Sequence, residues 1–271
     1  MTLQDRSQLA TARRVVVKVG SSSITGERAA QLDELVTAIA EARVRGTQVV
    51  LVSSGAIASG LPLLQLTARP NDLATQQAAA AVGQNALMHR YQSILDEHGI
   101  VAGQILLTAS DMEDPTSRSN ARRAMDRLLD LGVLPIVNEN DTVATQEIRF
   151  GDNDRLAALV AVLLRADALV LLSDIDSLYT KPPGTPGAEP IRTVPIDDHL
   201  DGVELGGVGS GVGSGGASTK VSAAKMAAEA GTAVLLTSTA QVSAALAGRS
   251  GGTWFEPAFR EVLPTGQLPT V

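Results

Sequence analysis

The 271-residue sequence contains no cysteine and very few aromatic residues. Without cysteine the chain cannot form disulfides, thiolate nucleophiles or cysteine-based zinc or iron–sulfur sites. Aromatic residues are 2% of the chain, so stacking platforms for single-stranded nucleic acid are missing. A purine pocket would have to be lined by backbone and small aliphatic side chains. The lack of cysteine also fits a reducing compartment, and we expect a cytoplasmic protein.

Long apolar runs and clusters of positive charge are missing as well. No apolar run reaches the roughly 18 residues that span a bilayer, and residues 1–14 lack the apolar segment of a secretory signal. The formal net charge is −7 with no basic run, whereas nucleic-acid binding needs a clustered cationic face. The three histidines show no metal-ligand spacing. We therefore expect neither a membrane nor a nucleic acid as partner.

Short apolar segments alternate along the chain with segments of helical periodicity. This alternation predicts an α/β fold with a doubly wound, mainly parallel sheet. The Pro- and Gly-rich residues 180–195 are expected to be a surface excursion without regular structure. We expect strands at 15–19, 48–53, 100–108, 133–137, 168–172 and 233–237, and helices at 28–45, 71–98, 119–131, 153–164, 218–230 and 241–247.

Two clusters of Asn and Asp, at residues 138–142 and 151–155, flank a short hairpin-like element. The first cluster ends the strand 133–137, and the second opens a helix. Ligands gather at such strand ends and helix starts in open α/β sheets, so we interpret the stretch as the floor of a site. The alternative is two turns and a helix cap, but a cap needs one such residue and three stand in a row at 152–154.

Lys18 lies inside an apolar strand and is followed by a Gly-Ser-Ser-Ser turn. Because lysine is almost never buried without a partner, this position suggests a bound anion; the alternative is a lysine that extends to solvent. The strand 48–53 likewise opens into Ser54-Gly55-Ala56. Its backbone amides could bind an anion or carboxylate, or the glycine could only serve close packing.

A glycine-rich tract at 206–216 precedes the helix that contains Lys220. No strand precedes the tract, so its G-x-G-x-x-G match is not a dinucleotide fingerprint, and the residue order is not that of a P-loop. A lysine in the first helical turn faces the positive end of the helix dipole unless an anion lies between them. Loop, helix start and lysine together suggest polyphosphate binding; the alternative is a flexible linker before a helix.

With these residues in view, the chain resembles the amino-acid kinase superfamily, and within it the glutamate 5-kinase family. The matching segments follow the family's order and extend over roughly residues 14–256. The pairing of Asn-Glu-Asn-Asp (138–141) with Gly-Asp-Asn-Asp (151–154) is quite specific to glutamate 5-kinases. The segments are Val-Lys-Val-Gly-Ser-Ser (17–22), Ser-Ser-Gly-Ala-Ile-Ala-Ser-Gly (53–60), Ala-Ala-Ala-Val-Gly-Gln (79–84), Gly-Gly-Ala-Ser-Thr-Lys (215–220), Asn-Glu-Asn-Asp-Thr-Val-Ala-Thr (138–145) and Gly-Asp-Asn-Asp (151–154).

The resemblance implies a three-layer αβα sandwich with a mainly parallel open sheet, and an enzyme. The implied reaction is ATP-dependent phosphorylation of the side-chain carboxylate of L-glutamate to L-glutamyl 5-phosphate, the first step of proline biosynthesis. Lys18, Lys220 and Asp154 would be catalytic, and Mg²⁺ would be held mainly by the ATP phosphates, without protein ligands. Glutamate would be bound by Ser54, Gly55, Ala56, Asn138, Asp141, Asp152 and Asn153. ATP would be bound by Lys18, Gly20, Ser21, Ser173, Asp174, Ser214, Gly215, Gly216, Ala217, Ser218, Thr219 and Lys220.

The resemblance also implies the domain organisation and the partners. We expect one kinase domain at 1–256, with the amino-acid side at 14–165 and the nucleotide side at 166–256, a tail at 257–271 and no C-terminal PUA domain. Expected partners are proline as a feedback inhibitor, the glutamyl-phosphate reductase of the next step, and further copies in a dimer or tetramer. The sequence departs from the family pattern at three positions, which bear on nucleotide affinity. Ser173 stands where the family usually has Thr, and Ala217 where it usually has Met. Pro182 lies near the position at which the family commonly has an acidic residue.

The implied chemistry agrees with the residue types present. A glutamate side chain has a pKa of about 4.3, so it is ionised at neutral pH and needs no general base. The reaction requires two anions held in line with their charge neutralised, which two lysines and Mg²⁺ can do. Two alternatives stay open: a kinase for acetylglutamate or uridylate, and a non-catalytic amino-acid sensor. A sensor would not need both lysines and Asp154, and all three are present.

Overall fold

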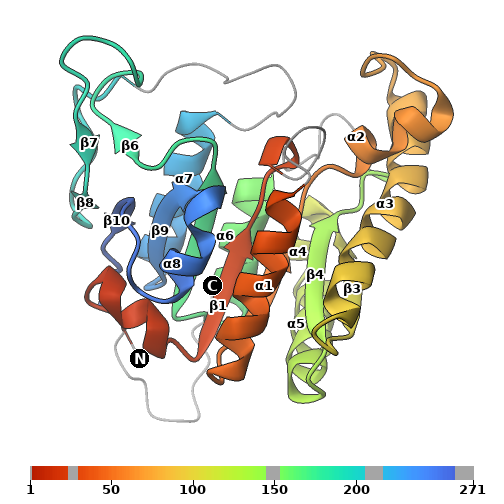
Figure 1. Ribbon diagram of the computed structural model, residues 1–271, viewed down its shortest axis with the longest axis horizontal. Helices are drawn as coiled ribbons and strands as arrows, with labels where there is room; N and C mark the ends of the chain where they lie inside the picture. Colours follow the sequence, from red (N-terminus) through yellow and green to blue (C-terminus); the bar gives the residue numbers. More distant parts are fainter. Residues whose placement is uncertain (1, 24–29, 145–152, 205–215, 260–271) are drawn as a thin grey trace.

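The computed structural model describes residues 2–23, 30–144, 153–204 and 216–259. An eight-stranded sheet crosses the molecule in the order β3-β4-β2-β1-β5-β9-β10-β8 (Figure 1). A separate two-stranded sheet pairs β6 with β7. The strands are β1 (Arg14–Lys18), β2 (Gln48–Val52), β3 (Ala102–Leu107), β4 (Leu134–Glu139), β5 (Ala168–Ser173), β6 (Leu178–Tyr179), β7 (Pro190–Ile191), β8 (Thr193–Val194), β9 (Ala233–Ser238) and β10 (Thr253–Phe255).

Six neighbouring strands of the large sheet, from β3 to β9, are parallel. β10 is antiparallel to β9, and β8 pairs with β10 in parallel. The prediction of a mainly parallel open sheet is therefore confirmed. Because these six strands run the same way, their carboxyl ends meet at one edge, where open α/β sheets bind ligands.

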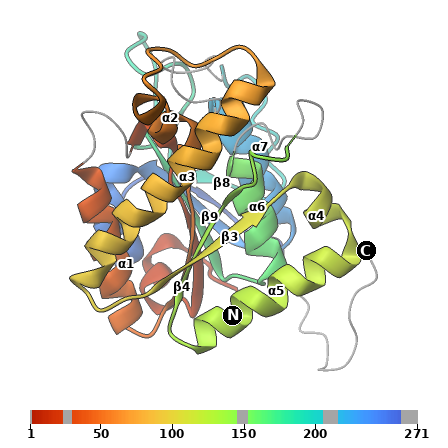
Figure 2. The same cartoon turned by 90° about the vertical axis from the view of Figure 1, so that its right-hand side faces the viewer.

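Helices cover both faces of the sheet, which confirms the three-layer prediction. In Figure 1, α1 and α8 lie in front of the strands and α6 and α7 behind them; Figure 2 shows α3 and α5 on opposite sides of β3 and β4. The helices are α1 (Gln31–Val44), α2 (Ala56–Gly60), α3 (Leu73–Asp96), α4 (Ala109–Glu113), α5 (Pro115–Asp130), α6 (Asn153–Leu163), α7 (Ala217–Glu229) and α8 (Val242–Leu246), with 3₁₀ turns η1 (Arg6–Thr11), η2 (Ser21–Ser23), η4 (Pro62–Leu64) and η5 (Thr239–Gln241).

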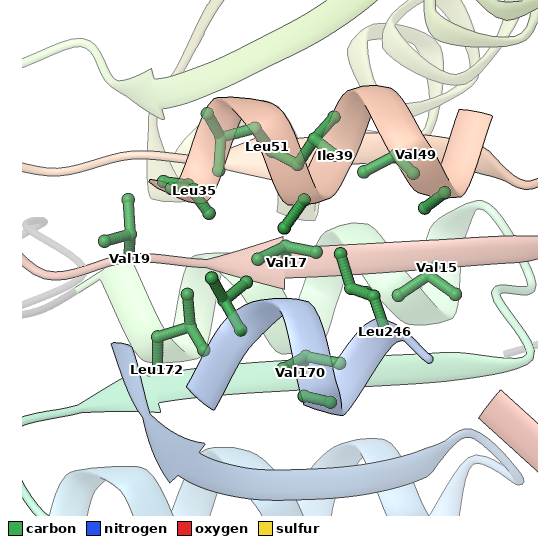
Figure 3. Close-up of a cluster of buried hydrophobic side chains, with 14 of the residues drawn as sticks. Val15, Val17, Val19, Leu35, Ile39, Val49, Leu51, Val170, Leu172 and Leu246 are labelled. Carbon is green, nitrogen blue, oxygen red and sulfur yellow. The ribbon is translucent and has the colours of Figure 1, made fainter. Parts of the chain in front are cut away.

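The three consecutive valines of β1 show no alternation with polar residues because both faces of the strand are buried. Val15 and Val17 point into the core under α1, α3 and α8, and Val16 points into the opposite core with α6 and α7. Figure 3 shows the first core, with Val17 beside Leu51 and Val170 of the neighbouring strands. Successive strand residues face opposite sides, so a strand covered on both faces is apolar throughout.

Residues 180–195 differ from the sequence-based expectation. The expected excursion contains β7 and β8, and β8 joins the large sheet through Val194, which pairs with Phe255. Pro190 is exposed in the two-stranded sheet, where its missing N–H is tolerated. The short helix α4 was not expected either; Thr108 begins it with a capping box to Asp111.

The helices α2 and α3 cross at very short distance because each has a glycine that faces the backbone of the other helix. A Cβ atom on Gly83 of α3 would lie 1.8 Å from the Ala56 carbonyl oxygen, and one on Gly60 of α2 would lie 1.9 Å from the Ala79 carbonyl oxygen. Neither position can carry a side chain in this arrangement. The start of α2 is thus held against α3. Over the described part of the chain, no helix combines the length and apolarity that a membrane span requires.

Candidate active site

Asp154 lies between two lysines that come from different parts of the chain. Its Oδ1 is 2.5 Å from Nζ of Lys18, and its Oδ2 is 2.9 Å from Nζ of Lys220. All three residues are buried, with exposed fractions of 0% for Asp154, 3% for Lys18 and 8% for Lys220. Two ammonium groups thus share one carboxylate, and these three side chains together carry one net positive charge. Lysine ammonium groups are common ligands of phosphate, so two of them converging on one carboxylate suit the binding of an anionic group.

Each of these three residues lies at or near one end of a strand or helix. Lys18 is the last residue of β1, Asp154 lies in the first turn of α6, and Lys220 lies in the first turn of α7. A carboxylate at a helix start is favoured by the helix dipole, whereas a lysine there is not. Burial alone would raise the pKa of Asp154, but the charges of Lys18 and Lys220 hold it below its usual value. Asp154 is therefore a carboxylate at neutral pH.

The described residues that are predicted to bind ATP lie at the ends of β1 and β5 and at the start of α7. The Ser22 hydroxyl lies 3.2 Å from an Asp174 carboxylate oxygen, which joins the turn after β1 to the end of β5. A Cβ atom on Gly20 would lie 3.9 Å from Lys18 Nζ, so the turn passes beside that ammonium group. Gly216 caps α7 without a side-chain hydrogen bond. Within the described part of the chain, the N–H groups of that first turn thus donate no hydrogen bond to an N-cap side chain, as in anion-binding helix starts.

Three of the residues that are predicted to bind glutamate lie where β2 leads into α2. Gly55 has a φ of 100°, a left-handed conformation that favours glycine, and it caps α2 without a side-chain hydrogen bond. Ser54 is half-buried beside it, and Ala56 is the first residue of the helix. The Ser53 hydroxyl lies 2.8 Å from the hydroxyl of Tyr91 on α3. Burial raises the pKa of Tyr91, so this phenol stays neutral.

A chain of buried side-chain amides joins the end of β4 to the start of α6. Nδ2 of Asn153 donates both its hydrogens, to the Ser53 carbonyl oxygen at 2.6 Å and to Oδ1 of Asn138 at 2.7 Å. Asn138 Oδ1 also accepts from the Glu139 backbone N–H at 2.9 Å. Asn138 Nδ2 donates to Oε1 of Gln84 at 2.8 Å. Asn153 can therefore act on a ligand only through its Oδ1, as an acceptor.

The structure brings several predicted substrate residues together but gives them different surroundings. Asn138 and Asn153 are in contact and buried, whereas Asp141 is half-buried in the turn after β4. Asn138 uses both amide atoms within the protein, which favours a positioning role over direct contact with a ligand. The described residues do not include Asp152, Ser214 or Gly215. Most of the hairpin expected after residue 142 also lies outside them, since the described segment ends at residue 144.

Sequence reasoning gave no role to Gln84 and Tyr91, although both contact the site's framework. Gln84, Leu87 and Tyr91 share one buried face of α3. A glutamine on an otherwise apolar stripe is the signal that could have found Gln84, since a buried amide requires a partner.

The described side chains contain no group of three or more His, Cys, Asp or Glu that could hold a metal ion. Both oxygens of Asp154 face lysines. The described side chains therefore fit a Mg²⁺ ion whose oxygen ligands come mostly from nucleotide phosphates and water.

Comparison with known proteins places this geometry in context. Residues 13–238 match the family model described as "Amino acid kinase family". The chain is 70% identical to the glutamate 5-kinase of Leifsonia xyli subsp. xyli over 259 residues, 95% of this chain and 96% of that protein. It is 66% identical to the glutamate 5-kinase of Clavibacter michiganensis subsp. michiganensis, over 95% of this chain and 99% of that protein.

The fold is also similar to a solved structure of low sequence identity. Carbamate kinase from Giardia lamblia bound to AMP-PNP superposes with a TM-score of 0.68, at 16% identity, over 92% of this chain and 100% of that chain. At this identity the likeness concerns the fold alone, and it agrees with the sheet and helix layers described above.

Proposed function

The chain belongs to the amino acid kinase family, and within it to the glutamate 5-kinases, and we propose that Lys18, Asp154 and Lys220 carry out its phosphoryl transfer. The enzyme phosphorylates the side-chain carboxylate of L-glutamate with ATP and Mg²⁺, the first step of proline biosynthesis. The observation that carries the assignment of these residues is the buried cluster of two lysines on one carboxylate.

In the reaction, a glutamate carboxylate oxygen forms a bond to the γ-phosphorus of ATP while the bond from that phosphorus to the β,γ-bridging oxygen breaks. ADP leaves, and L-glutamyl 5-phosphate is formed. The carboxylate has an ordinary pKa of about 4.3, so no proton has to be removed. Catalysis then depends on holding two anions in line and on stabilising charge at the phosphoryl oxygens.

Lys18 and Lys220 supply that stabilisation from two sides. Their ammonium groups are fixed by the same carboxylate, so they are in place before the substrates bind. Such preorganised charges stabilise a transition state without reorganisation. Asp154 positions the lysines and contributes no proton transfer. When bound, Mg²⁺ would neutralise phosphate charge, and we propose that the phosphates supply most of its ligands.

The α-amino group of glutamate is assigned to Asn153 and Asp141. Asn153 has only its Oδ1 to offer, because Nδ2 donates to Ser53 and Asn138. An acceptor suits an ammonium group, which has donors only. The start of α2 at Gly55 and Ala56, with Ser54, would bind a carboxylate of the substrate through backbone N–H groups. Acetylglutamate has no free ammonium group and does not need these acceptors.

ATP is assigned to the turn at Gly20 and Ser21, the end of β5 at Ser173 and Asp174, and the start of α7. The uncapped N–H groups of α7 and the exposed side chains of Ser218 and Thr219 support this assignment. Ser214 and Gly215 are proposed from the family pattern.

The family pattern also leads us to propose three partners. These are proline as inhibitor, the reductase that consumes glutamyl phosphate, and further copies of the chain. The activity is measured at sub-saturating glutamate with and without millimolar proline. An unchanged activity would refute the proposed inhibition by proline.

A substrate panel tests the proposed function. The protein is incubated with ATP, Mg²⁺ and one candidate acid at a time, and acyl phosphate is trapped with hydroxylamine. We expect hydroxamate and ADP from L-glutamate, and little or none from acetylglutamate or aspartate. If glutamate yields neither product while another acid does, the assignment is wrong. If no acid, carbamate or uridylate yields ADP, the chain is not a kinase of this type.

A further inference from the structure

The segment Ala79–Gln84 of α3 lies beside the amino-acid side of the site, yet the mechanism above gives it no role. Gly83 holds the start of α2, since its Cα lies against the Ala56 carbonyl. The next residue, Gln84, has 9% of its surface exposed and accepts a hydrogen bond from Asn138 at 2.8 Å. This segment therefore contacts two of the elements to which glutamate binding is assigned.

The orientation of each amide in the chain is fixed by backbone groups at its ends. The Glu139 N–H can only donate, so the Asn138 atom that faces it is Oδ1. The Ser53 carbonyl can only accept, so the Asn153 atom that faces it is Nδ2. Asn138 must then present Nδ2 to Gln84, and Gln84 must present an oxygen. Each of these contacts allows a single arrangement of donor and acceptor.

We propose that Gln84 is a positioning residue for glutamate binding. Its Oε1 holds the Asn138 amide, Asn138 Oδ1 holds Nδ2 of Asn153, and Oδ1 of Asn153 is thereby directed to the substrate ammonium group. The proposal rests on the proposed function. Gln84 acts through Asn138 and does not contact the phosphoryl group, so it affects glutamate binding rather than ATP binding.

Losing the acceptor at Gln84 would leave Nδ2 of Asn138 buried without a partner. Such a group is costly, so Asn138 would rotate or admit water. Either change weakens its hydrogen bond to Asn153. Among the described residues, no side-chain hydrogen bond joins Gln84 to the start of α7 or to the end of β5, so ATP binding should be unaffected.

Two substitutions separate the acceptor from the bulk of the side chain. Gln84→Met keeps the length and removes the acceptor, whereas Gln84→Glu keeps an acceptor oxygen in either protonation state. We expect Gln84→Met to raise the KM for glutamate about tenfold, the cost of one buried hydrogen bond. The KM for ATP should change less than about twofold, and Gln84→Glu should restore most of the glutamate affinity.

Gln92→Met, on the same helix, is the matched control. Gln92 bonds to Ile100 and Ala102 near the start of β3, so its substitution should leave both KM values unchanged. If Gln84→Met does not fold, Gln84→Asn withdraws the acceptor by one methylene and should give the same rise. Circular dichroism and thermal unfolding check each variant.

The result that overturns the proposal is equal glutamate KM in wild type, Gln84→Met and Gln84→Asn. An equal rise of both KM values, or no difference between Gln84→Met and Gln84→Glu, also overturns it, since Gln84 would then be structural only. Hydroxamate formation by the wild type decides the proposed function separately. An active wild type with unchanged variants refutes the role of Gln84 and leaves the proposed function standing.

Discussion

Among single residues, Asp154 has the most unusual surroundings. A fully buried carboxylate would ordinarily be destabilising, but here each oxygen faces an ammonium group at 2.5 and 2.9 Å. We propose that the two converging ammonium groups make the cluster a site for a phosphoryl group rather than only a structural ion pair. The same arrangement sets a dependence of stability on pH.

The first prediction concerns acid stability. The two lysines lower the pKa of Asp154 from its ordinary value of 3.8, against the opposing effect of burial. A carboxyl group whose pKa is lower in the folded than in the unfolded chain stabilises the fold above its unfolded pKa, and this contribution is lost as the pH falls through the folded pKa. We expect the free energy of unfolding to decrease below about pH 4, and Asp154→Asn to reduce this slope.

Urea unfolding of both proteins at a series of pH values from neutral to about 3 measures the two slopes. At neutral pH, Asp154→Asn should also cost on the order of 3 kcal/mol, since two buried ammonium groups lose their partner. Identical slopes in the two proteins would show that Asp154 does not contribute in this way.

At the scale of elements, α3 contacts the elements to which we assign glutamate binding. Gly83 packs against α2, Gln84 bonds to the end of β4, and Tyr91 bonds to Ser53 at the end of β2. Gln84 and Tyr91 are seven residues apart, two helical turns, and so lie on one face. The helix thereby fixes the junction of β2 with α2 and the end of β4, which come from separate parts of the chain.

The second prediction is that Gly83→Ala destabilises the protein. In an exposed helix the same change would stabilise by roughly 1 kcal/mol, because alanine is the better helix former. Here the new methyl group would meet the Ala56 carbonyl oxygen at 1.8 Å, so backbone must move. We expect a loss of about 1–3 kcal/mol of stability, with a raised KM for glutamate as α2 shifts.

Thermal and urea unfolding measure the change, and Ser93→Ala on an exposed position of α3 is the control. The control should be neutral or slightly stabilising. If Gly83→Ala is as stable as the wild type, the close crossing of α2 and α3 does not hold in solution.

The strands β1, β2, β4, β5 and β9 could be predicted because continuous apolar runs are typical of buried parallel strands. Residues 178–195 could not, since β8 forms only by pairing with β10, some sixty residues later. Lys18 and Lys220 could be singled out by their positions in a buried strand and in a first helical turn, whereas their grouping with Asp154 came from the resemblance to the kinase family. The inward orientation of Asn138 could not be predicted, because its partner Gln84 lies 54 residues away.

At the scale of the whole molecule, the two proposed sides of the site correspond to two halves of one sheet. The strands β3, β4, β2 and β1 form one half and β5, β9, β10 and β8 the other, and they meet where β1 pairs with β5. The core on one face includes Val17 from the first half and Val170 from the second. Lys18 ends β1 of the first half, and Lys220 lies in α7, which packs on β5 and β9 of the second half.

The third prediction is that both halves unfold together. Trp254, the only tryptophan, is buried in β10 and reports on the second half, whereas far-ultraviolet circular dichroism reports on all helices, α1 and α3 included. Because the halves share strand pairing and core, we expect the two probes to give coincident urea transitions. Saturating ATP with Mg²⁺, or glutamate, should shift both transitions together. Separate midpoints would contradict a single cooperative unit.

The assignment of the phosphoryl-transfer centre is tested most directly by the turnover number of Lys220→Ala at saturating glutamate, ATP and Mg²⁺. Lys225→Ala, on the same helix but outside the cluster, is the control. We predict that Lys220→Ala reduces kcat by about 10²-fold or more, since a preorganised charge at the phosphoryl group is lost, whereas Lys225→Ala stays close to wild type. A folded Lys220→Ala protein with near-normal kcat would contradict the assignment.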